Sequence, residues 1–257
     1  MLRCIFFGRD QFGYATFMEI QKESMHKIVG VVSSSVESES QLLRRESESL
    51  GLPYFCPNDI NDGRFLEDIS QLAPDLNVNV NLNHIFRDEL IGLPLHDTIN
   101  LHAGLCPNYR GGGSIYGAII NGETEFGLTV HFMDAGIDSG PIIIQEKIPI
   151  GPDDNMGVLH ERMEKIAPTI IRKALNQIDN GDFIARKQAH IHGSYFPKKP
   201  DGDEIINWSE SSQLIYDRIR ARNPGPLNKT YLGRNEIIIK RASLTDYPIF
   251  TGTCGQV

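Results

Sequence analysis

Residues 98–113 read TINLHAGLCPNYRGGG, a stretch in which a buried strand turns into a surface loop. The segment starts with the alternation of a strand, carries Asn100 and His102 two residues apart, and runs into a loop that ends in three glycines. Side chains at positions i and i+2 of a strand project from the same face. The amide and the imidazole are therefore expected side by side, near the carboxyl end of a strand.

The rest of the N-terminal half alternates short apolar runs with amphipathic segments. This β-α-β rhythm predicts an α/β fold with a Rossmann-like, mostly parallel sheet and helices on both faces. In open parallel sheets ligands bind at the carboxyl ends of the strands, where Asn100 and His102 are expected. The expected strands span residues 2–7, 27–34, 52–57, 76–82 and 97–103, and the expected helices span residues 14–28, 38–51 and 63–75.

Beyond the glycine loop the chain is expected to complete one main domain, residues 1–190. Its last elements are expected to be a helix over residues 114–122, strands over 126–134 and 140–150, and a helix over 155–178. Pro168 is expected to kink or split this last helix, because proline cannot donate the helical hydrogen bond.

A linker of residues 191–207 and a small C-terminal appendage of residues 208–257 are expected to follow. The sequence of the appendage predicts a capped helix that ends at Asn-Pro-Gly-Pro, followed by a β-hairpin around Gly233. Residues 251–257 resemble the start of a further strand. The appendage is therefore either a minimal unit that pairs with a second subunit, as in a homodimer, or the first part of a truncated β-barrel.

Composition narrows the functional classes. The chain has 257 residues and a formal net charge of −8, and an acidic balance argues against a nucleic-acid binder. The four cysteines form no C-x-x-C pair, which argues against a structural zinc site and a disulfide framework. No run of about 18 apolar residues suggests a membrane span. These features favour a cytoplasmic enzyme without a metal.

Asn100, His102 and Asp138 are the candidates for chemistry. An amide NH2 can donate to a developing oxyanion, an imidazole can take a proton from a nucleophile, and a carboxylate can orient and stabilise that imidazole. The alternative for Asn100 and His102 is that both cap the end of the strand by bonding loop backbone. The alternative for Asp138 is turn chemistry, since it lies in the glycine-punctuated sequence AGIDSG.

Five motifs in this order are more specific than any one of them. They are N-x-H at 100–102, P-x-Y-R-G at 107–111, N-G-E at 121–123, T-V-H-F-M-D at 129–134 and D-S-G-P-I-I-I-Q at 138–145. The combination closely resembles the formyltransferase superfamily that uses 10-formyltetrahydrofolate. Its members include methionyl-tRNA formyltransferase, glycinamide ribonucleotide transformylase and the sugar N-formyltransferases. The resemblance is strongest over residues 75–150.

The resemblance implies transfer of a formyl group to a primary amine, with Asn100, His102 and Asp138 as the catalytic residues. It implies 10-formyltetrahydrofolate as co-substrate and no metal. The residues it assigns to the folate are Leu82, Ile85, Phe86, Arg87, Gly136 and Ile137. The possible contacts of the acceptor are Arg9, Phe12, Tyr109, Arg110 and Gly111.

Two further residues are read as structural. The chain has HAGLCP where the family commonly has HPSLLP, so Cys106 is expected to be a small apolar filler and not a nucleophile. His131 lies in an expected strand and is interpreted as structural.

Three hypotheses for the acceptor stay open. The first is a nucleotide-linked amino sugar, which the resemblance of the short appendage favours and which suggests synthesis of lipopolysaccharide or another surface glycan. The second is methionyl-tRNA, which predicts a basic insertion where this chain has VSSSVESESQLLRRESESLG. The third is of another class, a folate hydrolase or a noncatalytic folate-binding module.

Overall fold

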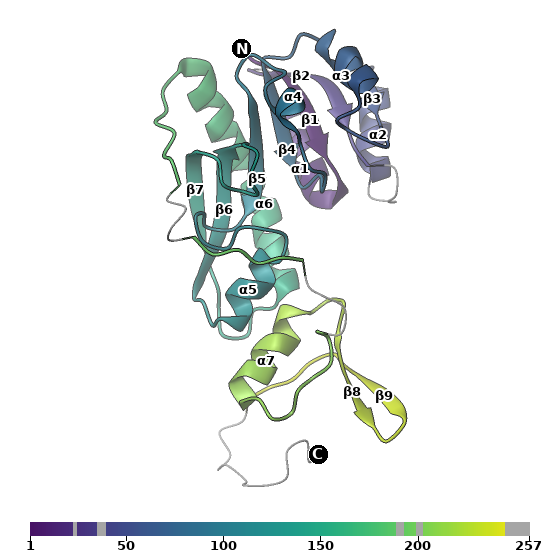
Figure 1. Cartoon of the computed structure of the whole chain (residues 1–257), viewed down its shortest axis with the longest axis vertical. Coiled ribbons are helices and arrows are strands. Elements are labelled where there is room, and N and C mark those ends of the chain that lie inside the picture. The colour runs from purple at the N-terminus through teal and green to yellow at the C-terminus, as the bar shows by residue number, and fades with distance from the viewer. Residues whose placement is uncertain (23–24, 35–39, 189–192, 199–202, 245–257) are drawn as a thin grey trace.

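The computed structural model describes residues 1–22, 25–34, 40–188, 193–198 and 203–244. A seven-stranded sheet in the order β3-β2-β1-β4-β5-β6-β7 forms its centre (Figure 1). The first five strands in that order run parallel, and β6 and β7 run antiparallel to their neighbours. The strands are β1 (Arg3–Gly8), β2 (Lys27–Val32), β3 (Tyr54–Phe55), β4 (Leu76–Val80), β5 (Thr98–Ala103), β6 (Glu125–Phe132) and β7 (Ile142–Pro149).

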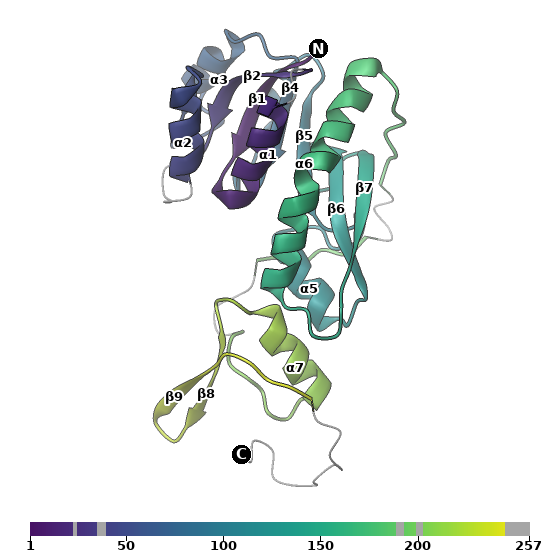
Figure 2. The ribbon, with the colours of Figure 1, turned by 180° about the vertical axis from the view of Figure 1, so that it is seen from behind.

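Helices cover both faces of the sheet, which confirms the predicted fold class. On one face the helices pack over the larger apolar cluster, with α1 beside α6 (Figure 2). The opposite face of β1 and β2 is covered by a second apolar cluster from the α3 and α4 regions. The helices of the main domain are α1 (Asp10–Lys22), α2 (Ser40–Ser49), α3 (Gly63–Ser70), α4 (Asp88–Ile91), α5 (Ser114–Ile120) and α6 (Met156–Asn180).

Alternation along the central strands separates an apolar face from a polar face. Val78 of β4 and Ile99 of β5 point into the larger cluster. Asn79 and Asn100, one residue further along these strands, are paired across the β4–β5 ladder and lie on the other face. Both asparagines are buried, so each needs hydrogen-bond partners within the protein. This polar face carries the candidate site.

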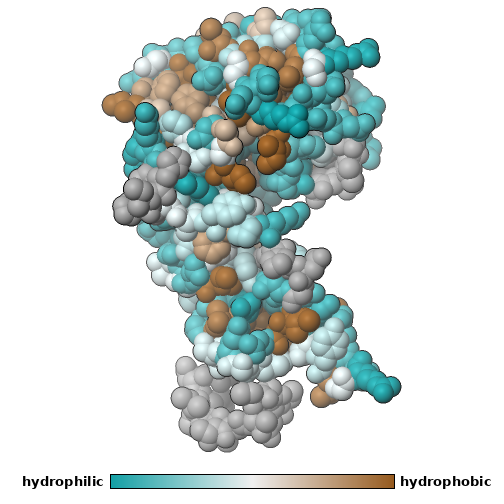
Figure 3. All heavy atoms as spheres, in the orientation of Figure 1, coloured by the Kyte–Doolittle hydropathy of each residue, from teal (hydrophilic) through white to brown (hydrophobic). Residues whose placement is uncertain are grey.

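A small C-terminal unit packs on the main domain through α7 (Ser212–Ala221), which contacts α5. The hairpin follows as β8 (Asn228–Leu232) and β9 (Asn235–Ile239), so the predicted turn is confirmed. Figure 3 shows hydrophilic and hydrophobic residues interspersed on the face it displays. The hairpin exposes Tyr231, Leu232, Ile237 and Ile238. Pairing with a second subunit stays a prediction.

The bounds expected for the first helix were wrong, and so was one of the two outcomes expected at Pro168, a split of the helix. The first helix spans Asp10–Lys22 and not 14–28, because Ile28 belongs to β2. Pro168 does not split α6, which runs unbroken through it. The apolar stripe of α6 packs in the larger cluster, and this packing outweighs the lost hydrogen bond. The strand expected at 251–257 and the domain boundary near residue 190 lie outside the described residues.

No helix within the described ranges is long and apolar enough to cross a membrane.

Candidate active site

The candidate site lies on the polar face where β5 and β6 pair. Asn100 and His102 point to this face, and His131 of β6 lies directly across the ladder from Asn100. Opposed residues of an antiparallel pair share a face, so three polar side chains converge. All three are less than a tenth exposed.

Asp138 comes from the loop between β6 and β7, which folds back over this face. Its Oδ1 accepts a hydrogen bond from Nδ2 of Asn100 at 3.1 Å and lies 3.5 Å from Nε2 of His131. Its Oδ2 lies 3.3 Å from Nδ1 of His102 and accepts the backbone N–H of Gly111 at 2.9 Å. Asp138 has a φ of 49°, so the backbone takes a left-handed conformation to aim this carboxylate. The structure therefore brings the predicted trio together around one carboxylate.

Burial and neighbouring charges shift the pKa values of Asp138 and His102. Burial alone would raise the pKa of Asp138, but His102, His131 and the Gly111 N–H hold it well below its usual range. Burial lowers the pKa of His102, and the Asp138 carboxylate and the Tyr109 carbonyl offset only part of that shift. Burial thus favours the neutral form of the imidazole, beside a carboxylate whose pKa is depressed. A neutral imidazole can accept a proton, as a general base must.

His131, which the sequence analysis interprets as structural, also lies in this cluster. Its Nε2 lies 3.2 Å from Nδ2 of Asn100, and its Nδ1 lies 2.7 Å from the carbonyl oxygen of Phe132. A carbonyl only accepts, so Nδ1 carries a proton, and Nε2 faces both the Asn100 amide and the Asp138 carboxylate. The alternation of T-V-H-F is the sequence signal for this position, because it places His131 on the face of the strand opposite to that of the apolar Val130.

A second amide fixes the orientation of Asn100. Nδ2 of Asn79 donates to Oδ1 of Asn100 at 2.9 Å, and Oδ1 of Asn79 accepts the backbone N–H of Leu82 at 3.2 Å. Oδ1 of Asn100 is thereby occupied, and its NH2 group is turned toward Asp138. The chain of hydrogen bonds joins the segment after β4 to the loop after β6.

The residues predicted for folate lie on these two segments, with different exposure. Leu82 and Phe86 are buried in the smaller apolar cluster, so their side chains belong to the core. Ile85 and Ile137 are 71% and 48% exposed. Arg87 precedes α4, and Gly136 donates its N–H to Asp134.

The residues predicted for the acceptor are mostly engaged with other parts of the protein. Phe12 is 8% exposed and belongs to the larger cluster, so its ring is core. Nε of Arg9 donates to the Asn81 carbonyl at 2.8 Å. The Arg110 guanidinium donates to Oε1 of Gln188 at 2.8 and 3.0 Å.

The glycine loop packs against the chain itself. A Cβ atom at Gly111 would lie 2.6 Å from the Phe196 carbonyl oxygen, and one at Gly113 would lie 2.3 Å from that of Pro197. The Tyr109 ring stacks on Phe196 with centroids 5.0 Å apart. These glycines make room for residues 193–197, which lie in the predicted linker.

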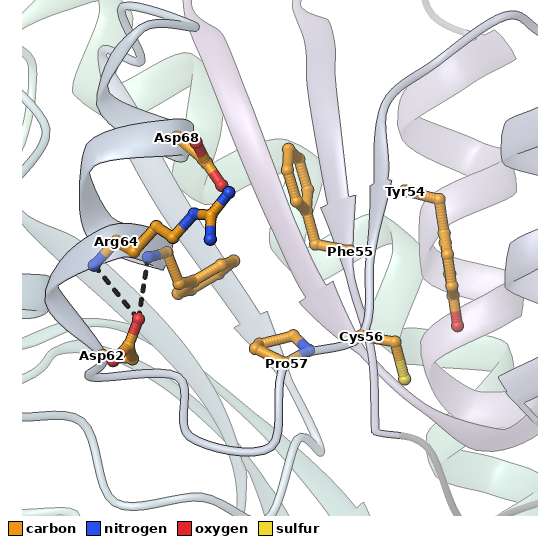
Figure 4. A pocket seen from close by; sticks show the side chains of 8 residues that line it. Tyr54, Phe55, Cys56, Pro57, Asp62, Arg64 and Asp68 are labelled. Carbon is orange, nitrogen blue, oxygen red and sulfur yellow. Dashed lines mark hydrogen bonds between the residues drawn. The ribbon is translucent and has the colours of Figure 1, made fainter.

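A separate depression lies at the far edge of the sheet and contains none of the predicted site residues. Figure 4 shows its lining, with Asp62 accepting the backbone N–H groups of Arg64 and Phe65 at the start of α3. It opens beside β3, which β2, β1 and β4 separate from β5. The described residues contain no cluster of histidine, cysteine or acidic side chains that would hold a metal ion.

Comparison with known proteins identifies the class of the chain. Residues 2–175 match the family model described as formyl transferase. The chain belongs to the formyl transferase family. This match confirms the family that the motifs resemble.

Curated relatives are similar over most of the chain. The methionyl-tRNA formyltransferase of Moorella thermoacetica is 37% identical over 207 residues, which are 80% of this chain and 66% of that protein. This chain thus spans just under two thirds of that relative. The methionyl-tRNA formyltransferase of Kosmotoga olearia is 29% identical over 100% of this chain and 84% of its own length.

Solved structures with this fold include sugar-modifying formyltransferases. A 4-N formyltransferase from Francisella tularensis has a TM-score of 0.77 at 22% identity, over 95% of this chain and 98% of that chain. The N-formyltransferase from Helicobacter canadensis, in complex with folinic acid and dTDP-3-aminofucose, has a TM-score of 0.69 at 21% identity, over 86% and 80%. At this identity the likeness shows the fold alone.

Proposed function

We propose that this protein transfers a formyl group from 10-formyltetrahydrofolate to the primary amine of a nucleotide-linked amino sugar. The observation that carries the transfer is the convergence of Asn100 and His102 on the Asp138 carboxylate, in a chain of the formyl transferase family. The acceptor rests on the charge of the chain and on its C-terminal unit.

Each member of the trio has a role in attack of an amine on the formyl carbon. The Asn100 amide donates to the negative charge that develops on the formyl oxygen. His102 takes a proton from the amine and returns it to the folate nitrogen from which the formyl carbon departs. Asp138 holds the imidazole and stabilises it while it carries that proton. One C–N bond forms, one breaks, and the proton is conserved.

Exposed apolar side chains on the segments that carry Asn79 and Asp138 would suit the pterin ring of the folate. Ile85 and Ile137 expose apolar surface on the two segments that the hydrogen bonds of Asn79, Asn100 and Asp138 join. A flat heterocycle needs such apolar surface together with backbone donors and acceptors. When bound, the folate supplies the formyl group at the Asn100 amide.

A small acceptor agrees with the ion pairs that the arginines of the C-terminal unit form. The three arginines of the α7 region each pair with a carboxylate. Arg218 lies 2.8 Å from Glu210, Arg220 lies 2.7 Å from Asp217, and Arg222 lies 2.7 Å from Asp203. Guanidinium groups neutralised in this way contribute little to binding a phosphate backbone. The formal net charge of −8 acts in the same direction.

Methionyl-tRNA is the second candidate, because relatives up to 37% identical carry the name methionyl-tRNA formyltransferase. Incubation with 10-formyltetrahydrofolate and a panel of UDP-, GDP- and dTDP-linked 3-amino and 4-amino sugars tests the proposal, with charged methionyl-tRNA as the competing acceptor. Formylation of one sugar nucleotide supports it. Formylation of methionyl-tRNA alone refutes the sugar assignment, and release of formate without an amine product identifies a hydrolase.

A further inference from the structure

The Tyr109 peptide lies against the ring of His102. Nε2 of His102 is 2.7 Å from the carbonyl oxygen of Tyr109. A Cβ atom at Gly104 would lie 2.5 Å from both of these atoms, so only glycine leaves room for the contact. Tyr109 has a φ of 58°, a left-handed conformation that aims its carbonyl at the ring. Because a carbonyl only accepts, this contact stabilises a proton on Nε2 and thereby the protonated ring, whose Nδ1 faces Asp138.

Residues 193–197 hold that peptide from the opposite side. The Tyr109 N–H donates to Oγ of Ser194 at 2.9 Å, and the Arg110 N–H donates to the Ser194 carbonyl at 3.0 Å. The Phe196 N–H donates to the Arg110 carbonyl at 2.8 Å, and the Gly113 N–H donates to the Phe196 carbonyl at 2.9 Å. With the stacked rings of Tyr109 and Phe196, these contacts form a short strand-like pairing over the loop.

We infer that residues 193–197 position the catalytic histidine, with Ser194 and Phe196 as positioning residues that act through the Tyr109 carbonyl. The inference rests on the proposed role of His102 in formyl transfer. Ser194 and Phe196 contact Tyr109, and Tyr109 contacts His102. Their effect is to keep an acceptor at Nε2, on the side of the ring opposite to Asp138.

Residues 193–197 thereby influence the pKa of His102. Asp138 and the Tyr109 carbonyl both raise the pKa of this ring, whereas burial, His131 and Arg110 lower it. Arg110 is held on Gln188, and His131 is held on Phe132. Loss of the Tyr109 contact therefore lowers the pKa of His102. The acid limb of a rate profile that requires the neutral base then moves to lower pH.

Two neighbouring glycines provide a matched pair of variants. In Gly113→Ala the new methyl group would lie 2.3 Å from the Pro197 carbonyl oxygen, so residues 193–197 must shift. In Gly112→Ala no described atom lies within 4 Å of the new methyl group. Ser194→Ala removes the hydroxyl that accepts the Tyr109 N–H and adds no atoms to the loop. Ser194→Thr keeps a hydroxyl at this position.

The experiment measures kcat, KM and the pH profile of kcat, and it titrates His102 by NMR in each full-length variant. Gly113→Ala and Ser194→Ala are expected to lower kcat about five- to tenfold and to move the acid limb down by about half to one pH unit. KM and the melting temperature should change little in Ser194→Ala. Gly112→Ala and Ser194→Thr should follow the wild type.

The inference would be overturned if the pH profiles and NMR titrations of Ser194→Ala and Gly113→Ala superimposed on those of the wild type. An equal loss of kcat in all four variants with no shift of the titration would overturn it as well, since it would show a general loss of integrity. If the wild type formylates no amine, the proposed function fails. The NMR comparison still decides the positioning of His102 in that case.

Discussion

Replacing Asp138 by asparagine removes one negative charge and keeps the shape of the side chain. The carboxylate accepts from Asn100 and Gly111 and faces His102 at 3.3 Å. A hydrogen bond to a charged group contributes about 1.5–3 kcal/mol, and the bond to His102 is the one that strengthens when the ring takes a proton. Loss of about 3 kcal/mol from that state corresponds to a decrease in kcat of roughly 100-fold.

The pH dependence of this variant has a defined sign. Asp138 raises the pKa of His102, so the asparagine variant should have its acid limb at lower pH than the wild type. The pKa of Asp138 itself is depressed, so its contribution to stability is present above the unfolded pKa of about 3.9 and is lost as the pH falls below it. The difference in unfolding free energy between the two proteins should therefore narrow below about pH 4.

The assay follows formation of tetrahydrofolate at saturating acceptor from pH 5 to 9, alongside folate binding by calorimetry and urea unfolding at several pH values. Folate affinity should be retained, which separates chemistry from binding. Wild-type kcat with an unshifted acid limb would refute the assignment of Asp138. A variant that loses folate binding and kcat together would show instead that Asp138 shapes the folate site.

Three further outcomes are expected. His102→Ala should abolish transfer while folate still binds, and retained turnover would contradict its role. Burial raises the pKa of the Cys106 thiol to about 12, so iodoacetamide at pH 8 should label the exposed Cys56 before Cys106, as read by mass spectrometry, and Cys106→Ala should keep its turnover. Ile99→Ala, at a fully buried site of the central sheet, should lower the free energy of unfolding by about 2–5 kcal/mol in urea, and a loss under 1 kcal/mol would contradict the packing described.

The fold was predictable because its signals are local. Short apolar strands between amphipathic segments fix the parallel sheet, and the periodicity of two places Asn100 and His102 on one face. Helix boundaries were less predictable, since the apolar Ile28 continued a helical spacing by coincidence while it belongs to β2. Pro168 misled in the same way, because packing on the sheet outweighs a local preference.

The site was predictable only in part. Asp138 followed from the order of the motifs and the family they resemble, because no local rule brings a turn residue over a strand more than thirty positions away. The contact of His131 with Asn100 could not be predicted, because a strand pattern does not reveal which neighbouring strand it will pair with. Residues 193–197 were missed for a stronger reason. The glycines from 111 to 113 signal a close approach, and sequence alone does not say to what.

The pairing of Tyr109 with Ser194 also has a bearing on the order in which the protein is made. The two residues are 85 positions apart, and a ribosome that adds about 5–20 residues per second needs several seconds to span that interval. Once Asp138 has been added, the nascent chain carries Asn100, His102 and Asp138 and still lacks the segment that braces the loop beside them. Asn100, His102 and Asp138 are thus synthesised before residues 193–197, which brace the loop beside them.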